Sequence, residues 1–451
     1  RTRARNWAAI SEGKAPVVVG ARSALFLPYA DLGLIIVDEE HDQAYKQDEG
    51  AHYHARDMAV VRAHIAKIPI VLASATPSVE SEVNARKGRY QRVALPSRFG
   101  GQHMPHIEAI DMRRAPPPRG RFISPVLAEQ IRHAIERREQ ALLFLNRRGY
   151  APLTLCRTCG HRFQCPSCSA WLVEHRRFKS LQCHHCGYNQ KLPPACPSCN
   201  DAENLVACGP GVERIYEEAK ALFPDHRLMI LASDTAESNE ELKTMLAQIH
   251  NGEIDIIIGT QIIAKGHHFP YVTLVAILDI DAGLLSVDIR APERTAQLIV
   301  QVAGRAGRGE HKGDVYLQTL RPDHPLLSTL VEQDYRAFAR QTLKERQAAL
   351  LPPFRYTALI RCESKSQEQN QQFLQQHAQW LRENSEQLID IWGPIPAPME
   401  RKAGRYQAHL VLLSQDRARL HFYLRAWWQN MLHHKPSNMK LSLDIDPQEF
   451  S

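Results

Sequence analysis

The chain contains the stretch Leu34-Ile35-Ile36-Val37-Asp38-Glu39-Glu40-His41, in which four apolar residues run directly into three carboxylates and an imidazole. A short apolar run bounded by polar residues predicts a strand buried on both faces of a parallel sheet. Its acidic end then lies at the carboxyl edge of the sheet, where open α/β folds bind ligands. Carboxylates gathered there suit a hydrated Mg²⁺, which takes one or two of them together with substrate phosphates. The stretch therefore predicts an α/β domain with a magnesium and phosphate site after this strand.

Three further stretches along the chain have a similar character. Ile70-Val71-Leu72-Ala73 is an apolar run that ends in Ser74-Ala75-Thr76. Ile254-Asp255-Ile256-Ile257-Ile258-Gly259-Thr260-Gln261 leads into Ala264-Lys265-Gly266, and the set closes with Gln301-Val302-Ala303-Gly304-Arg305-Ala306-Gly307-Arg308. In sequence and in order, the four stretches resemble motifs II, III, V and VI of superfamily 2 helicases of the DExH type. The resemblance implies two RecA-like lobes with parallel sheets.

Length and composition set broad limits. A chain of 451 residues is long enough for two to four domains that each bury a core. The formal net charge of +7 modestly favours polyanionic partners such as nucleic acids. No run of about eighteen apolar residues occurs, so no membrane span is expected. The chain starts with Arg1 and nothing near it reads as a signal peptide, so we expect a cytoplasmic protein whose own beginning is missing.

Changes in composition divide the chain into segments. Residues 1–100 have the pattern of the C-terminal part of helicase lobe 1, and the glycines and prolines within 101–123 indicate a linker. Strands that alternate with helices in 124–155 and 205–322 predict the parallel sheet of lobe 2. Residues 156–204 interrupt this lobe as a cysteine-rich insertion, and residues 323–451 predict a separate C-terminal α+β domain.

Eight of the ten cysteines form four Cys-x-x-Cys pairs. In a reducing compartment such pairs indicate metal rather than disulfides, and eight thiolates imply two tetrahedral zinc sites. Four pairs can be joined in three ways, and we favour the nested one because its inner gap matches the spacing of zinc ribbons. The inner site then consists of Cys165, Cys168, Cys183 and Cys186, and the outer site of Cys156, Cys159, Cys196 and Cys199. Cys208 and Cys362 are expected to be buried apolar residues.

Two segments beside the acidic stretch are candidates for contact with nucleic acid. Val17-Val18-Val19-Gly20 is a strand candidate that leads to Arg22 and Ser23, which suit a backbone phosphate. Residues 42–56 interleave aromatic residues, which stack on unpaired bases, with cations, which follow phosphates. The predicted contacts in this loop are Tyr45, Lys46, Tyr53 and Arg56. The alternative for both segments is an ordinary loop, solvated or packed on the domain.

The sequence has no Gly-x-x-x-x-Gly-Lys-Ser/Thr phosphate loop. Gly13-Lys14 comes nearest, but Ala15 follows the lysine and Ala8 stands where the first glycine belongs. The amides and the lysine that hold the β and γ phosphates are therefore expected upstream of Arg1. These 451 residues alone are expected to be inactive as an ATPase.

Over essentially the whole chain, the motifs resemble the primosomal protein N′ (PriA) family of bacterial replication restart. The resemblance is carried by the helicase motifs, by Arg22-Ser23-Ala24-Leu25-Phe26, by a double four-cysteine block ahead of motif V and by the closing Leu443-Asp444-Ile445-Asp446-Pro447-Gln448-Glu449-Phe450. RecQ-type helicases also hold zinc, but theirs follows lobe 2 and has one site. The family implies an ATP-dependent 3′ to 5′ DNA helicase that acts at stalled or collapsed forks and D-loops and initiates primosome assembly.

The same resemblance implies cofactors and partners. The cofactors are two Zn²⁺ and ATP with Mg²⁺. The partners are branched and single-stranded DNA, single-stranded DNA-binding protein and other primosome proteins, for a monomeric, nucleoid-associated bacterial protein. The alternative is a non-catalytic, zinc-containing module for DNA binding and partner docking, since the phosphate loop is absent.

The resemblance also implies roles for single residues. In the nucleotide site, Asp38 holds Mg²⁺ through water and Glu39 orients and deprotonates the attacking water. The arginines of motif VI neutralise charge on the γ-phosphoryl group, and glycine in motif V lets the backbone approach a phosphate. The remaining implied nucleotide-site residues are His41, Gly266, Gln301, Arg305 and Arg308, and the implied DNA contacts of motif V are Thr260, Gln261 and Lys265.

Overall fold

The computed structural model describes residues 2–95, 105–118, 120–145, 153–156, 158–159, 161–175, 180–183, 185–202, 205–208, 211–232, 238–260, 269–284, 286, 288–307, 312–332, 334–385 and 387–449. The chain forms two compact units, which are described separately. Unit 1 comprises Arg1–Arg92, Arg346–Ala397 and Gln407–Ser451, and unit 2 comprises Val93–Glu345 and Pro398–Tyr406.

Unit 2 is built on a parallel sheet. In the described part of the chain it has six strands in the order β12-β13-β6-β14-β15-β5. The strands are β5 (His106–Asp111), β6 (Gln140–Phe144), β12 (Leu228–Leu231), β13 (Ile256–Gly259), β14 (Val272–Ile277) and β15 (Asp314–Thr319). The central strands β6, β13 and β14 are buried along their whole length, as expected of strands covered on both faces. This confirms the predicted parallel α/β lobe.

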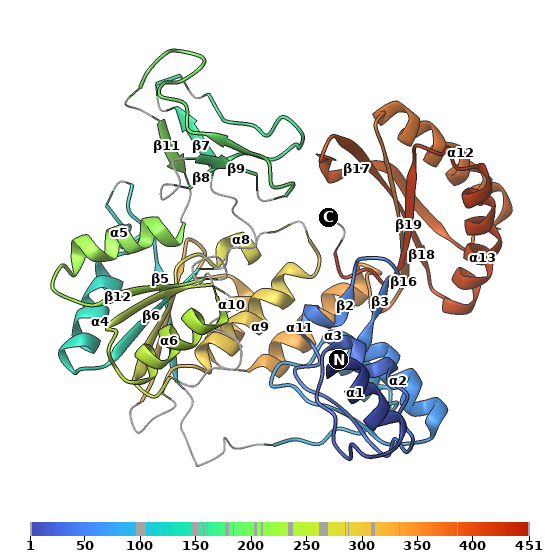
Figure 1. Ribbon diagram of the computed structural model, residues 1–451, viewed down its shortest axis with the longest axis horizontal. Coiled ribbons are helices and arrows are strands. Elements are labelled where there is room, and N and C mark those ends of the chain that lie inside the picture. The colour runs from blue at the N-terminus through green and yellow to red at the C-terminus, as the bar shows by residue number, and fades with distance from the viewer. Residues whose placement is uncertain are drawn as a thin grey trace. The chain divides into compact units, whose positions relative to one another are not determined.

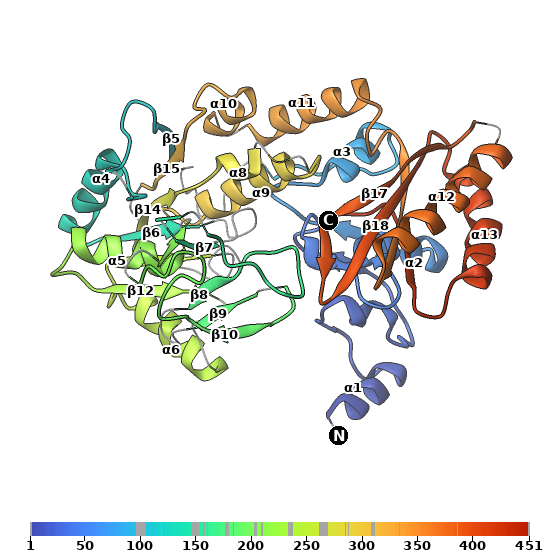
Figure 2. The ribbon, with the colours of Figure 1, turned by 90° about the horizontal axis from the view of Figure 1, so that it is seen from above.

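Helices cover both faces of this sheet (Figures 1 and 2). One face packs on α4 (Pro125–Glu136) and α5 (Val212–Leu222). The other packs on α6 (Asn239–His250), α9 (Ala291–Ala303), α10 (Pro325–Val331) and α11 (Tyr335–Ala348), and the short α8 (Asp281–Leu284) follows β14. Helix α4 starts at Pro125, because the Ser124 hydroxyl accepts the Leu127 N–H at 3.2 Å and proline suits the first helical position.

Strand β5 lies within residues 101–123, which the sequence analysis assigned to a linker. Residues His106 to Asp111 pair in register with Asp314 to Thr319 of β15. Ile107 packs into one apolar core of the sheet and Ile110 into the other, while His106 and Glu108 are exposed. Because β5 is an edge strand with polar positions and a proline-rich segment after it, its alternation was too weak to detect in the sequence.

The cysteine-rich insertion leaves and rejoins the lobe through two antiparallel strands, β7 (Leu153–Cys156) and β11 (Leu205–Cys208). Among its described residues, an antiparallel sheet follows the order β10-β9-β8, with β8 at Val173–His175, β9 at Ser180–Gln182 and β10 at Asn189–Lys191. Its small core joins Phe163, Leu172 and Leu181 to buried cysteines. The insertion is coloured green in Figure 1.

Residues 1–92 of unit 1 contain the acidic stretch. Strand β1 (Ile35–Val37) pairs in parallel with β4 (Ile70–Leu72), and α2 (Ala55–Ala66) packs on this pair. The other elements are α1 (Thr2–Ser11), the 3-10 turns η1 (Arg22–Phe26) and η2 (Gln43–Tyr45), the hairpin β2 (Lys46–Gln47) and β3 (Tyr53–His54), and α3 (Val79–Arg86).

Two expectations for this region differ from the structure. Residues 17–20 do not form the predicted strand, and the side chains of Val17 and Val19 are 80% and 95% exposed. Strand β1 was predicted to be buried on both faces, but Ile36 is 64% exposed. Val71 on the neighbouring strand β4 is 47% exposed. The described helix α2 packs on this pair of strands, yet it leaves these apolar side chains uncovered.

The C-terminal part of unit 1 is an α+β domain, as predicted. Its sheet follows the order β17-β18-β16-β19, with β16 at Tyr356–Ser364, β17 at Asp390–Lys402, β18 at Arg405–Ser414 and β19 at Lys440–Ile445. Helices α12 (Gln367–Asn384) and α13 (Arg417–His434) share its core, which is centred on Trp427. Cys362 is buried in this core as expected, whereas the side chain of Cys208 lies outside the described residues. In the part of the chain that the structure describes, no helix has the length and apolarity to cross a membrane.

Candidate functional site

Asp38 and Glu39 are exposed directly after β1, at the carboxyl edge of the β1–β4 pair. The Asp38 carboxylate accepts the N–H of Glu39 at 3.0 Å, and the Tyr45 hydroxyl donates to the Asp38 carbonyl at 2.6 Å. Glu39 has φ +46°, in the left-handed region that residues other than glycine seldom adopt. This turn leaves both carboxylates accessible where a strand ends, and exposed oxygens at such an edge fit a hydrated Mg²⁺.

His41 connects the acidic stretch with motif III. Its side chain is 4% exposed, its Nδ1 lies 2.7 Å from the Ser74 hydroxyl, and its Nε2 lies 3.4 Å from the Thr76 hydroxyl. A Glu39 carboxylate oxygen lies 3.6 Å from the same Nδ1. These contacts connect Glu39 to motif III inside the first lobe.

Glu40, the third acidic residue, is 1% exposed and accepts several hydrogen bonds. The Ser78 N–H donates to Oε1 at 2.7 Å, and the Ser78 and Ser81 hydroxyls donate to Oε2 at 3.1 and 3.0 Å. These donors lie at the start of α3, where the Ser78 hydroxyl also caps the helix. Burying a carboxylate is costly unless it is paired and hydrogen-bonded, and Arg56 provides the pairing.

Arg56 was predicted to contact DNA, and the structure does not support this role. Its side chain is buried, with Nη1 at 3.0 Å from Glu40 Oε2 and 2.7 Å from the Ser78 hydroxyl. Burial alone would lower the pKa of this guanidinium, but Asp57, Glu40 and Glu80 raise it overall, so the group stays charged. Arg56 therefore fixes the acidic stretch against α3 from inside the domain.

We expect Arg56→Met to lower the local free energy of unfolding around α3 by about 3–5 kcal/mol, because it leaves Glu40 buried without its cation. Hydrogen exchange of the Ser81 and Glu82 amides in the full-length protein measures this loss. Arg5→Ala, which removes an exposed arginine of α1, is the matched control and should leave those amides unchanged. Equal exchange in wild type and Arg56→Met would contradict the role.

Lys46, also predicted to contact DNA, is likewise buried. Its ammonium pairs with the Asp444 carboxylate of β19 and lies 3.4 Å from the Ile445 carbonyl. Arg361 holds the other oxygen of Asp444 at 3.2 Å. Lys46 therefore ties the loop after the acidic stretch to the C-terminal sheet within unit 1.

Lys46→Met in the full-length protein is expected to leave the salt dependence of DNA binding unchanged. Loss of a phosphate contact would instead reduce the slope of log K against log salt by about one. Titrations at several salt concentrations distinguish the two cases. Asp444→Asn breaks the same pair without removing a cation, so both variants should lower the melting temperature while neither alters the slope.

The other predicted contacts near this loop are partly accessible. Ser23 is exposed, whereas Arg22 donates to the Lys46 carbonyl and Tyr53 packs edge-on against Phe26 at 5.3 Å between ring centroids. Tyr45 is half-buried, and burial followed by the charges of Asp38, Asp42, Glu39 and Glu40 raises its pKa. The contacts of Arg22 with Lys46 and of Phe26 with Tyr53 thus join the two segments 22–26 and 42–56.

The motif V and VI residues belong to unit 2, and the acidic stretch belongs to unit 1. Thr260 is buried at the end of β13. Gln301 lies in the last turn of α9, and Arg305 is 8% exposed in the turn after it. Gly313 packs closely on Ala306, and a Cβ atom at position 313 would lie 2.6 Å from the carbonyl carbon of Ala306. This close packing anchors the turn. The predicted residues Gln261, Lys265, Gly266 and Arg308 lie outside the described residues.

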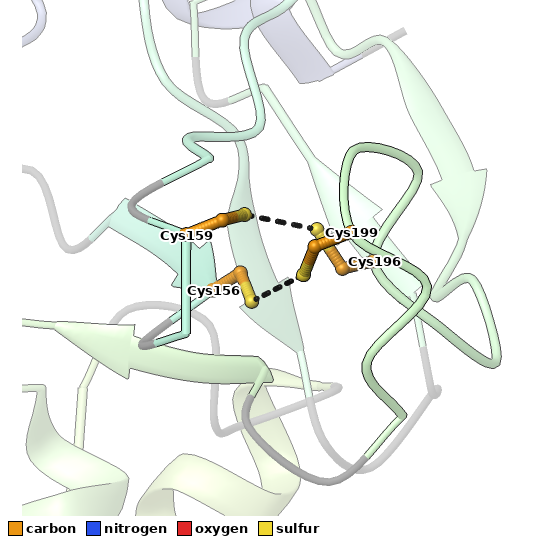
Figure 3. Close-up of side chains that lie close together, drawn as sticks. All are labelled: Cys156, Cys159, Cys196 and Cys199. Carbon is orange, nitrogen blue, oxygen red and sulfur yellow. Dashed lines mark hydrogen bonds between the residues drawn. The ribbon is translucent and has the colours of Figure 1, made fainter.

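Among the described residues, the cysteines gather in two groups of four, as the nested pairing predicts. One group is Cys165, Cys168, Cys183 and Cys186, the other is Cys156, Cys159, Cys196 and Cys199, and the sulfurs of each lie within 4.8 Å of one another. Figure 3 shows the outer group, whose side chains converge from two separate loops.

The sulfur separations fit zinc and exclude disulfides. Cys156 and Cys199 are 3.6 Å apart, as are Cys159 and Cys196, and Cys165 and Cys186. A disulfide requires about 2.05 Å, whereas two thiolates about 2.3 Å from one tetrahedral zinc ion are about 3.8 Å apart. Each group can therefore hold one Zn²⁺ with four protein ligands, which leaves no open position for catalysis.

Family models match three parts of the chain. Residues 165–191 match the PriA DNA helicase Cys-rich region domain, residues 200–310 the helicase conserved C-terminal domain, and residues 347–448 the primosomal protein N C-terminal domain. These matches fall on the inner cysteine group, on much of the parallel sheet and on the C-terminal domain.

Curated relatives are similar over nearly the whole chain. The replication restart protein PriA of Rickettsia felis is 45% identical over 441 residues, which cover 98% of this chain and 67% of the relative. The proteins of the same name from Haemophilus influenzae and Bacillus subtilis are 42% and 36% identical, with 99% and 98% of this chain and 60% and 55% of the relatives covered. The chain thus spans about 55–67% of the length of these relatives.

Among solved structures, RecG bound to a three-way DNA junction is 16% identical and covers 77% of this chain and 34% of that chain, with a TM-score of 0.36. Saccharomyces cerevisiae Dbp5 bound to RNA and ADP BeF3 is 12% identical and covers 69% and 63%, with a TM-score of 0.34.

Proposed function

The chain belongs to the PriA family of replication restart proteins, and from this premise we propose that it is the motor, zinc and C-terminal part of an ATP-dependent DNA helicase. The observation that carries the proposal is the pair of exposed carboxylates, Asp38 and Glu39, on a turn that His41 fastens to motif III. Such a turn is suited to hold a reaction site for ATP at the end of a parallel strand.

In this mechanism Asp38 would hold Mg²⁺, which when bound would supply positive charge beside the phosphates. Glu39 orients the attacking water and accepts its proton. Arg305, on the turn after α9, and Arg308 stabilise the charge that spreads over the γ-phosphoryl group, a role worth about 10³-fold or more in related systems. Gln301 and the motif V residues Thr260, Gln261, Lys265 and Gly266 complete the nucleotide and DNA contacts.

We further infer the substrates and partners. The helicase moves 3′ to 5′ on single-stranded DNA, acts at stalled forks and D-loops, and starts primosome assembly with single-stranded DNA-binding protein and other primosome proteins in the bacterial cytoplasm, at the nucleoid. Similarity to curated restart proteins and the helicase domain match support this assignment. Unwinding assays with the full-length protein on forks that carry either a 3′ or a 5′ single-stranded arm test the direction.

A second candidate function is a non-catalytic module for DNA binding and partner docking. It is favoured by the absence of a Gly-x-x-x-x-Gly-Lys-Ser/Thr loop from these 451 residues. Calorimetric titration of residues 1–451 with ATP and Mg²⁺ separates the two functions. We expect no tight binding to these residues alone and tight binding to the full-length protein. The absence of ATP binding by both proteins would favour the module.

A further inference from the structure

The C-terminal domain carries a long hairpin whose tip belongs to the other unit. Strands β17 and β18 meet at a two-residue turn of Ala403 and Gly404, both with positive φ, +48° and +78°. Such turns favour glycine and match the twist of hairpin strands. Residues 398–406 are part of unit 2, whereas the rest of both strands belongs to unit 1.

The tip is hydrogen-bonded to the turn that carries two inner-site cysteines. The Gly404 N–H donates to the Ser167 carbonyl at 2.7 Å. The Ser169 N–H donates to the Arg401 carbonyl at 2.8 Å, and the Arg401 N–H donates to the Ser169 hydroxyl at 2.9 Å. These bonds use mainly backbone atoms, so they fix the position of the tip irrespective of its side-chain rotamers.

A fourth bond reaches a metal ligand directly. The Ala403 N–H donates to the Cys168 sulfur at 3.2 Å, and Cys168 is 2% exposed. Other cysteine sulfurs accept amide N–H groups from within the insertion. Ser167 donates to Cys165, and Asp201 donates to Cys199. Thr158 and Cys159 donate to Cys156. Cys168 therefore differs, because its amide donor lies 235 residues further along the chain, in the hairpin tip.

The charge of the tip suits this position. Four thiolates around one Zn²⁺ leave about two negative charges on the inner site. Arg401, Lys402 and Arg405 place three cations around the two-residue turn. An amide donor and nearby cations both stabilise thiolates as ligands, and partners of this kind typically change metal affinity about 10- to 100-fold.

We propose that the hairpin tip, residues 401–405, is a working part of the inner zinc site. The Ala403 amide holds the Cys168 thiolate as a ligand, and a zinc-filled inner site in turn holds the tip. The hairpin tip and the cysteine-rich insertion are thereby linked through the metal site. Loss of the inner zinc releases this link.

A shortened hairpin in the full-length protein tests the proposal. Deleting Arg401, Lys402, Arg405 and Tyr406 joins Glu400 to Ala403 and Gly404 to Gln407. This removes two residues from each strand, so the remaining side chains keep their faces. Zinc release to a colorimetric chelator is followed over time. Cys183→Ser, which should lack the inner zinc, shows which kinetic phase of zinc release belongs to the outer site.

We expect the inner-site phase to be about 10- to 100-fold faster in the shortened protein, with the outer-site phase unchanged. The control Lys402→Ala retains the turn and its amides and should change the inner phase by less than about threefold, well below the effect of losing the amide donor. Unchanged release of both ions, or equal acceleration of both, would overturn the proposal, since the latter would indicate unfolding of the whole insertion.

A second measurement avoids changing the hairpin. When the inner zinc is removed from the otherwise unaltered protein, hydrogen exchange of the amides at 401–404 should accelerate while that at 408–413 stays slow. Continued protection of the tip amides would contradict the link. Both readouts are independent of ATP hydrolysis, so their failure would leave the proposed helicase function untouched.

Discussion

Glu39→Gln in the full-length protein is expected to lower DNA-stimulated ATP hydrolysis by about 10²- to 10⁴-fold, the usual range for loss of a positioned general base. The substitution keeps the size of the side chain but removes its basicity. Glu39 is suited to this role because its carboxylate is accessible after β1 while His41 and motif III hold the turn beside it. Steady-state ATPase assays with and without a DNA fork measure the effect.

The control for this variant is Glu49→Gln, an exposed glutamate of the same loop that does not lie at the strand end. It should retain the ATPase rate of the wild type. Affinity for a DNA fork should be nearly unchanged in both variants, because neither residue is placed against DNA. Undiminished hydrolysis by Glu39→Gln would remove the acidic stretch from the catalytic mechanism.

Cys183→Ser should reduce the zinc content of the protein from two ions to one and leave the part of the insertion around the inner site without a stable fold. Burial of Phe163, Leu172 and Leu181 contributes only about 1.5–3 kcal/mol per side chain. Ordering the backbone costs about 1–2 kcal/mol for each residue, and the insertion has several tens of residues. Structural zinc contributes about 10–16 kcal/mol in small domains, so metal decides whether this insertion folds.

Elemental analysis of zinc per chain and limited proteolysis within residues 156–204 check this expectation. Cys362→Ala is the matched control, because Cys362 is also fully buried but lies in the core of the C-terminal domain. It should retain two zinc ions and a protected insertion. If Cys183→Ser kept two ions, the assignment of this residue to the inner site would be wrong.

Local sequence patterns were sufficient where the deciding contacts are close in sequence. The apolar runs of β6 and β13 specify buried parallel strands, and Ser124-Pro125 specifies the start of α4. The Cys-x-x-Cys spacing specifies metal, and the gap lengths favoured the nested grouping that the structure has. Edge strand β5 was missed because a half-exposed strand carries little of the apolar signal on which such reasoning depends.

The loop 42–56 marks the limit of sequence reasoning. A cation between aromatic residues has the same local pattern whether it faces DNA or the protein interior, and Lys46 and Arg56 turned out to be buried. Their surroundings depend on distant residues: Asp444 for Lys46, and Glu40 with Ser78 for Arg56. The Ala403 amide is also far in sequence, 235 residues, from the Cys168 sulfur that it contacts.

The sequence by itself determined the buried central strands, the two groups of cysteines that can hold metal and the position of the acidic stretch, because short-range spacing controls these features. Only the tertiary structure decided which charged residues are buried pairs and which domain supplies a donor to the inner zinc site. A charge is stable in the interior only beside a partner that folding brings to it, and no local pattern specifies where that partner comes from.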